Sequence, residues 1–130
     1  MIKVLGLSHS LGKRRVLCDI NFEIPDNTIL GVVGINGAGK STLLDLIAGV
    51  LPAAGGMVTV SGYDLATRSR EAKRRIGYLP EQPPLYPDMT VGEYLSFAAE
   101  LKGIAKKDRK DHIEKAIALA HLQDAKQRLI

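Results

Sequence analysis

Apolar residues alternate with polar ones along the first part of the chain. Over residues 16–24 every second position is apolar, which predicts a strand with one solvated face. A turn at residues 25–27 leads into an unbroken apolar run at residues 28–33, which predicts a strand buried on both faces. Shorter apolar runs predict two further strands, at residues 57–60 and 76–79.

Helical spacing replaces this alternation in later segments. Apolar residues three and four positions apart predict helices at residues 40–50 and 108–122. A run of charged residues predicts one helical turn at residues 71–75. Thr90 and Glu93 have the spacing of a capping box, so we expect another helix to begin at residue 91 and to end near residue 102. The chain therefore begins with strands, passes through a strand-loop-helix unit and ends in helices.

The composition is that of a globular protein. Of the 130 residues, 45% are hydrophobic and 25% are charged, which excludes a disordered, collagen-like or coiled-coil chain. Aromatic residues make up 5% and Trp is absent, which argues against a stacking surface for single-stranded nucleic acid. The net charge is +4. Two basic runs, at residues 68–75 and 102–110, are most simply solvated faces, with phospholipid head groups or an acidic partner as the alternative.

Metal, disulfide and membrane-spanning signals are weak. The single cysteine, Cys18, cannot form an intrachain disulfide, and we expect it to be a small core residue. Cys18 and the three histidines, His9, His112 and His121, are too scattered in the sequence to form a metal site of recognisable spacing. The N-terminus lacks the pattern of a signal peptide, and no apolar run reaches the roughly 20 residues of a spanning helix.

The strongest chemical signal is a glycine-rich loop at residues 34–41. It fits the pattern G-x-x-x-x-G-K-S/T and lies between a predicted strand and a predicted helix. We expect Gly34, Gly37 and Gly39 to take positive φ, so that backbone amides converge on a phosphate chain. The positive end of the following helix adds to this attraction. A flexible glycine loop without a ligand is the alternative.

The side chains at the end of the loop suggest nucleotide binding with Mg²⁺. The Lys40 ammonium can reach the β- and γ-phosphates, the Ser41 hydroxyl can ligate Mg²⁺, and Thr42 can reach the α-phosphate. The expected phosphate-binding positions are Gly34, Asn36, Gly37, Ala38, Gly39, Lys40, Ser41 and Thr42.

The chain lacks the NKxD motif with which a GTPase recognises guanine. The sequence on both sides of the loop resembles the nucleotide-binding domain of ABC transporters. The resemblance covers essentially the whole chain and is closest to the exporter branch that includes antibiotic, sodium and gliding-motility transporters. It is carried by residues 7–13, 16–24, 34–44, 47–49, 76–81 and 85–91. The implied fold is α/β: a P-loop NTPase core with N-terminal antiparallel strands and the start of a helical subdomain, as an incomplete domain.

The resemblance also implies roles for residues outside the loop. The segment after Ile76 resembles the Q-loop, which supplies an oxygen ligand to Mg²⁺. Glu81 occupies the position where the family most often has Gln, so it is the expected ligand by register, and Gln82, which follows it, is the other candidate. The alternative for Glu81 is a solvated loop carboxylate. Leu11 stands where the family often has an aromatic ring on adenine, and Val16 would cover another part of the base.

Other family motifs are not found in residues 1–130. The sequence contains no signature motif, no Walker B strand ending in Asp-Glu and no switch histidine, and so no catalytic base. We therefore expect the chain to be the N-terminal part of a larger ATP hydrolase and to bind nucleotide without turnover by itself. Because residues 28–33 would lack neighbouring strands, we also expect an exposed apolar edge and a marginal, aggregation-prone product.

The resemblance implies several partners and one location. They are ATP with Mg²⁺, a membrane permease and a second ATP-binding domain in a head-to-tail dimer, at the cytoplasmic face of the cell membrane, without nucleic acid. Two alternatives remain open: a truncated, non-hydrolysing nucleotide-binding fragment, and an ABC ATPase that acts outside transport.

Overall fold

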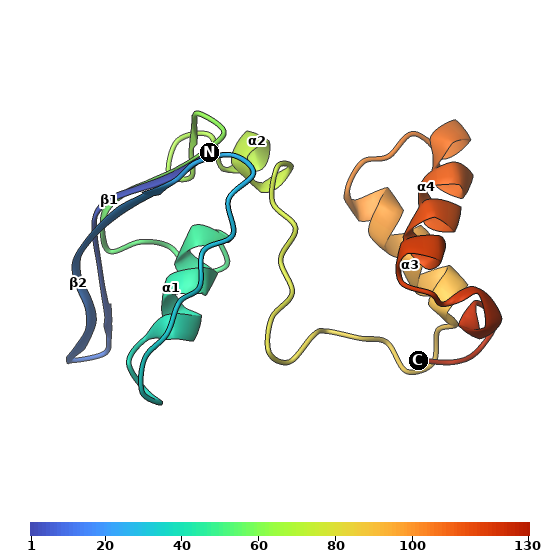
Figure 1. The fold of residues 1–130 in the computed structure, drawn as a ribbon, viewed down its shortest axis with the longest axis horizontal. Coiled ribbons are helices and arrows are strands. Elements are labelled where there is room, and N and C mark those ends of the chain that lie inside the picture. Colours follow the sequence, from blue (N-terminus) through green and yellow to red (C-terminus); the bar gives the residue numbers. More distant parts are fainter. The chain divides into compact units, whose positions relative to one another are not determined.

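The N-terminal part of the chain folds into a long β-hairpin. β1 (Ile2–Leu11) and β2 (Arg14–Ile24) pair antiparallel through a two-residue turn in which Gly12 has φ 59°. A positive φ at the first turn residue matches the twist of the paired strands, and glycine adopts it without strain. Figure 1 shows the computed structural model, which describes all residues from 1 to 130.

Two short strands complete an antiparallel sheet of order β2-β1-β3-β4. β3 (Gly55–Val60) pairs with β1, and β4 (Tyr63–Asp64) pairs with β3. The backbones of β1 and β3 lie close together at Gly6 and Gly56, where a Cβ on Gly56 would lie 2.5 Å from the Gly6 carbonyl carbon and oxygen. Only glycine fits at Gly56, which also has φ 89°.

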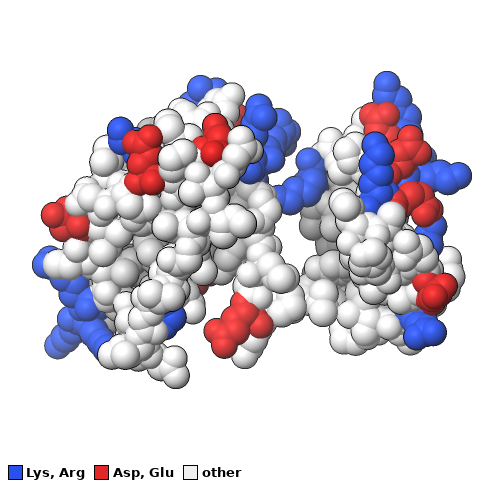
Figure 2. Space-filling model, in the orientation of Figure 1, with Lys and Arg blue, Asp and Glu red and all other residues white.

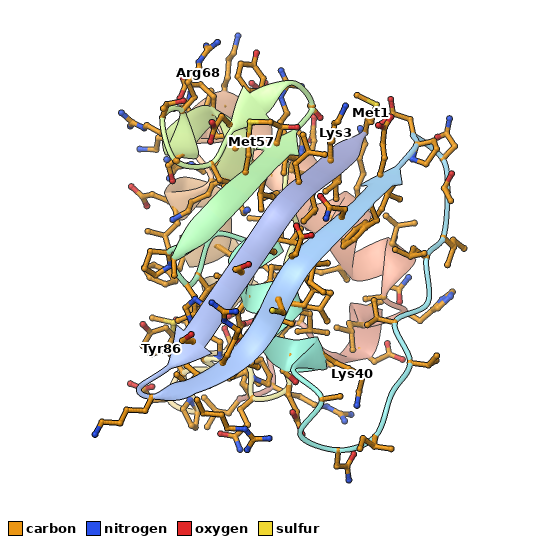
Figure 3. All side chains as sticks on the ribbon, turned by 90° about the vertical axis from the view of Figure 1, so that its left-hand side faces the viewer. Met1, Lys3, Lys40, Met57, Arg68 and Tyr86 are labelled. Atoms are coloured by element: carbon orange, nitrogen blue, oxygen red, sulfur yellow. The ribbon has the colours of Figure 1, made fainter.

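One face of the sheet is covered by α1 (Lys40–Ile47), which lies behind the strands in Figure 3. Leu43 and Leu46 of α1 are buried against the sheet. The buried sheet residues that share this core are Val4, Leu7, Leu17 and Val58. The predicted helix at residues 40–50 is therefore confirmed, although it ends at Ile47. The short helix α2 (Ser69–Lys73) lies against β4.

Two irregularities in β2 decide which side chains face this core. Ser10 pairs with Arg15 but His9 pairs with Leu17, so Val16 is an extra residue at that step. A second shift follows near Asp19, which has φ 50°. Each extra residue reverses the alternation of side chains. Leu17 is therefore buried, and Cys18 is exposed. The prediction that Cys18 is a core residue is wrong.

The segments predicted as strands at residues 28–33 and 76–79 pair with no strand. Ile29 is fully exposed, Val33 is 92% exposed and Leu79 is 81% exposed. A buried strand needs neighbours that take up its backbone N–H and C=O groups, and the four-stranded sheet of this chain does not extend to either segment. The strand predictions are wrong for this structure, whereas the expected apolar exposure of residues 28–33 is confirmed.

The chain divides into two compact units, Met1–Pro80 and Glu81–Ile130. The second unit contains α3 (Val91–Leu101), α4 (Lys106–Leu119) and the 3₁₀ turn η1 (Gln123–Ala125). α3 begins at the expected capping box, in which the side chains of Thr90 and Glu93 exchange hydrogen bonds with backbone amides. Ala99 of α3 and Ile117 of α4 are buried. No helix of either unit combines the length and the apolar character that crossing a membrane requires.

Candidate functional site

Residues 34–39 form a loop that ends at the first residue of α1. Gly37 has φ 79° and Gly39 has φ 91°, so both need the left-handed conformation that glycine adopts most easily. Gly34 does not have a positive φ, and a Cβ there would meet Ala38 at an ordinary 3.5 Å. The expectation of positive φ is therefore confirmed at two glycines and wrong at Gly34.

Lys40 bends back over this loop. Its Nζ donates hydrogen bonds to the carbonyl oxygens of Gly34 at 2.7 Å and Ile35 at 2.9 Å. The amide of Ala38 donates to the same Ile35 oxygen at 3.2 Å, which closes the loop from its other side. The ammonium group thus sits at the loop without a carboxylate partner. A positive charge held there by neutral carbonyls remains available to an anion.

The N-terminus of α1 adds a second positive feature. Its first intrahelical bond runs from the Leu43 amide to the Gly39 carbonyl, so the amides of Lys40, Ser41 and Thr42 have no acceptor within the helix. No side chain caps this end, and no acidic residue lies in the first turn. The helix dipole and the free amides therefore act together with Lys40 on the same small volume.

The start of β2 forms a wall beside the loop. A Cβ on Gly39 would lie 2.8 Å from Cγ1 of Val16 and 3.2 Å from Cδ2 of Leu17, so both side chains touch this glycine. Leu11 lies at the end of β1 and is 54% exposed. Figure 3 shows Lys40 at the same end of the first unit as the β1–β2 turn, in agreement with Figure 1. The structure brings Val16 to the loop and leaves Leu11 at the end of the hairpin.

The expected Mg²⁺ ligands are divided between the two units. Ser41 is exposed on α1 in the first unit, whereas Glu81 and Gln82 are exposed at the start of the second. All three offer hard oxygen donors, which suit Mg²⁺. No group of three His, Cys, Asp or Glu residues could hold a metal ion by itself. In the first unit Ser41 offers a single hydroxyl, which fits an ion that takes most of its ligands from phosphates and water.

Sequence patterns missed one polar contact close to this site. The Tyr78 hydroxyl donates a 2.5 Å hydrogen bond to the carboxylate of Asp45 on α1. This hydrogen bond, then partial desolvation, then the negative charge of Asp45 raise the pKa of Tyr78 above its ordinary value. The two residues are 33 positions apart in the sequence, and no local motif joins them.

Comparison with families and curated proteins gives a consistent picture. The model of the family described as ABC transporter matches residues 17–130. The linearmycin resistance ATP-binding protein LnrL of Bacillus subtilis is 33% identical over 110 residues, which are 85% of this chain and 35% of that protein. The lantibiotic transport ATP-binding protein SrtF of Streptococcus pyogenes is 31% identical over 106 residues, which are 82% of this chain and 45% of that protein. The chain thus spans less than half the length of these relatives.

Two solved structures share the fold. One, described as the ATP binding subunit of an ABC transporter, has a TM-score of 0.86 and 28% identity, and the match covers 99% of this chain and 54% of that one. The other is a dimer of the ATP-binding cassette MJ0796 in a post-hydrolysis state with ADP and Pi. Its TM-score is 0.82 at 20% identity, over 99% of this chain and 61% of that one, and it supports the fold alone.

Proposed function

Because this chain belongs to the ABC transporter family, we propose that it forms the nucleotide-binding part of an ATP hydrolase that drives transport, most simply export. The observation that carries this proposal is the position of Lys40, whose ammonium lies over the loop at the uncapped N-terminus of α1. A triphosphate has the charge and the oxygen acceptors that this arrangement lacks.

Each part of the loop has a distinct task in this proposal. The amides of residues 36–42 donate to the phosphate oxygens, with Gly37 and Gly39 allowing their approach, and the Ala38 amide exchanges the Ile35 carbonyl for a phosphate oxygen. Lys40 exchanges its two carbonyl acceptors for β- and γ-phosphate oxygens. Ser41 offers its hydroxyl to Mg²⁺, which offsets the charge of the phosphates when it is bound. Glu81, or Gln82 beside it, is proposed as a further oxygen ligand from the family resemblance alone.

Export is the finer part of the proposal. It is supported by relatives whose names refer to linearmycin resistance and lantibiotic transport. In this proposal the chain acts with a membrane permease and a second ATP-binding domain, and it lies at the cytoplasmic face of the membrane through that permease.

Nucleotide binding by the full-length protein tests the proposal. Equilibrium dialysis with Mg²⁺ and ATP is expected to show retention, and Lys40→Ala is expected to weaken it by about 10- to 100-fold, the loss of a charge-assisted hydrogen bond. Retention by neither protein, or equal retention by both, would contradict it. A turnover assay on the 130-residue chain addresses hydrolysis separately: we expect no turnover above that of Lys40→Ala, because these residues include no candidate base for the attacking water.

A further inference from the structure

The end of the β1–β2 hairpin carries a basic cluster without a structural task. Lys13, Arg14 and Arg15 are exposed, and Figure 2 shows Lys and Arg side chains gathered at this end of the hairpin. Neither Lys13 nor Arg14 takes part in an ion pair or a side-chain hydrogen bond. Arg15 differs, because its Nη1 lies 3.5 Å from Sγ of Cys18.

The register of the hairpin separates the two arginines onto opposite faces. Arg14 pairs with Leu11, and Leu17 pairs with His9, two residues earlier in β1. Directly paired residues and residues two apart on a regular strand share one face of a sheet. Arg14, Leu11 and Leu17 therefore share a face, while Arg15, which pairs with Ser10, lies on the other.

The face that carries Arg14 is the one that touches the phosphate loop. Leu17 and the extra residue Val16 both contact Gly39. At about 3.3 Å per residue, Arg14 lies about 10 Å from Leu17 along the strand. A nucleotide whose phosphates occupy the loop at Gly39 and Lys40 can extend its nucleoside along this face, past Val16 towards Leu11 and Arg14.

We propose that Arg14 contacts the base of the nucleotide bound at residues 34–42, with its guanidinium plane stacked on the ring and Leu11 supplying apolar contact beside it. This inference rests on the proposed nucleotide binding. A guanidinium group is planar, weakly hydrated and always charged, and it stacks on flat rings in a way that the compact ammonium of lysine does not. Leu11 has no ring face, and the ring of His9, which pairs with Leu17 on this face, is half-buried. Arg14 is therefore the exposed planar side chain at the tip of this face. Stacking makes no hydrogen bonds to the groups at the edge of the base, which distinguish adenine from guanine. ATP and GTP are therefore expected to bind with similar affinity.

Binding of two probes to the full-length protein tests this role. The probes are ATP and inorganic triphosphate, each with Mg²⁺, and the variants are Arg14→Ala and Arg14→Lys, with Arg15→Ala as the matched control on the opposite face. We expect Arg14→Ala to weaken ATP binding by about three- to tenfold, in line with stacking on an exposed cation, and to leave triphosphate binding unchanged. Arg14→Lys should lose nearly as much, and Arg15→Ala should change neither probe.

Other outcomes overturn the inference in distinguishable ways. Equal weakening of ATP binding and triphosphate binding by Arg14→Ala would show that Arg14 acts on the phosphates through its charge and does not contact the base. No weakening of either, or full rescue by lysine, would exclude stacking by Arg14. If the unaltered protein binds triphosphate as tightly as ATP, contacts to the base contribute nothing to binding, and only the proposed phosphate site is supported. If it retains neither probe, the proposed function fails and this inference with it.

Discussion

The Tyr78 hydroxyl donates a hydrogen bond of 2.5 Å to the carboxylate of Asp45, which joins the segment at residues 77–80 to α1. Asp45 lies five residues after Lys40 on the helix whose N-terminus faces the loop. Tyr78 lies three residues before Glu81, the expected metal ligand. The contact therefore ties the segment that carries Tyr78 to the helix that carries Lys40 and Ser41.

Tyr78→Phe should show how much this contact contributes to stability. Because the pKa of Tyr78 is raised in the folded state, its contribution is fully present below the ordinary tyrosine pKa and is lost as pH rises through the folded value. We expect the variant to melt a few degrees lower at neutral pH and the difference to shrink at strongly alkaline pH. Melting curves at the two pH values check this. Asp45→Asn keeps an acceptor and should lower the melting temperature less; an unchanged melting temperature for Tyr78→Phe would show that the contact contributes nothing.

Alanine at Gly56 should destabilise the sheet strongly. The new Cβ would lie 2.5 Å from the Gly6 backbone, which cannot move aside as a side chain can. Gly62→Ala is the matched control, since Gly62 has φ 80° but no atom within 4 Å of its Cβ position. We expect the control to cost about 1–2 kcal/mol from backbone strain alone, and Gly56→Ala to cost clearly more in urea unfolding. Equal losses would show that β1 and β3 separate without penalty.

The capping box of α3 makes a pH-dependent contribution. The Glu93 carboxylate accepts hydrogen bonds from the Thr90 amide and hydroxyl, each at 2.8 Å, and these lower its pKa. A lowered pKa means that the stabilisation is present above the ordinary value and is lost as pH falls through the folded value. We expect the stability difference between the protein and Glu93→Gln to shrink from about pH 6 to about pH 3. Urea titrations at both pH values measure it, and a constant difference would contradict it.

Loss of the Thr90 side chain tests the same cap from the other end. Its Oγ1 accepts from the Glu93 amide at 3.2 Å. Thr90→Ala should lower stability by about 1 kcal/mol, whereas Thr90→Ser, which keeps the hydroxyl, should recover most of it. If serine is as destabilising as alanine, the hydroxyl is not what matters.

The apolar exposure of residues 28–33 should be visible to a hydrophobic dye. Ile29 is fully exposed, so Ile29→Lys is expected to lower dye fluorescence and the rate of aggregation of the 130-residue chain. Thr28→Lys adds the same charge at an exposed neighbour without removing apolar surface, and should have a smaller effect. Equal effects would mean that charge alone governs aggregation.

Local signals in the sequence predicted local structure well. The capping box at Thr90 and Glu93 lies within one helical turn, and α3 begins where it predicts. The loop at residues 34–41 contains the glycines that shape it and the lysine that closes it, so the groups that interact there all belong to one short motif. In both cases the interacting groups are a few residues apart.

Features that depend on distant partners could not be predicted in this way. The alternation in β2 predicted a strand but not the extra residues near Val16 and Asp19, which are fixed by pairing with β1 and which exchange the positions of Leu17 and Cys18. The apolar run at residues 28–33 indicated strand propensity, but a strand also needs neighbours, and these are not a property of the run itself. The Tyr78–Asp45 contact and the shared face of Leu11 and Arg14 likewise appear only once the fold is known.

The outward position of Cys18 has a practical use. It is the single cysteine among these 130 residues, and its immediate neighbour Leu17 touches Gly39 of the phosphate loop. A fluorophore attached to this thiol would be held on the solvent side of the same strand, close to the loop but outside its ligand face. Such a label would report the arrival of a ligand optically while every residue of the candidate site stays intact.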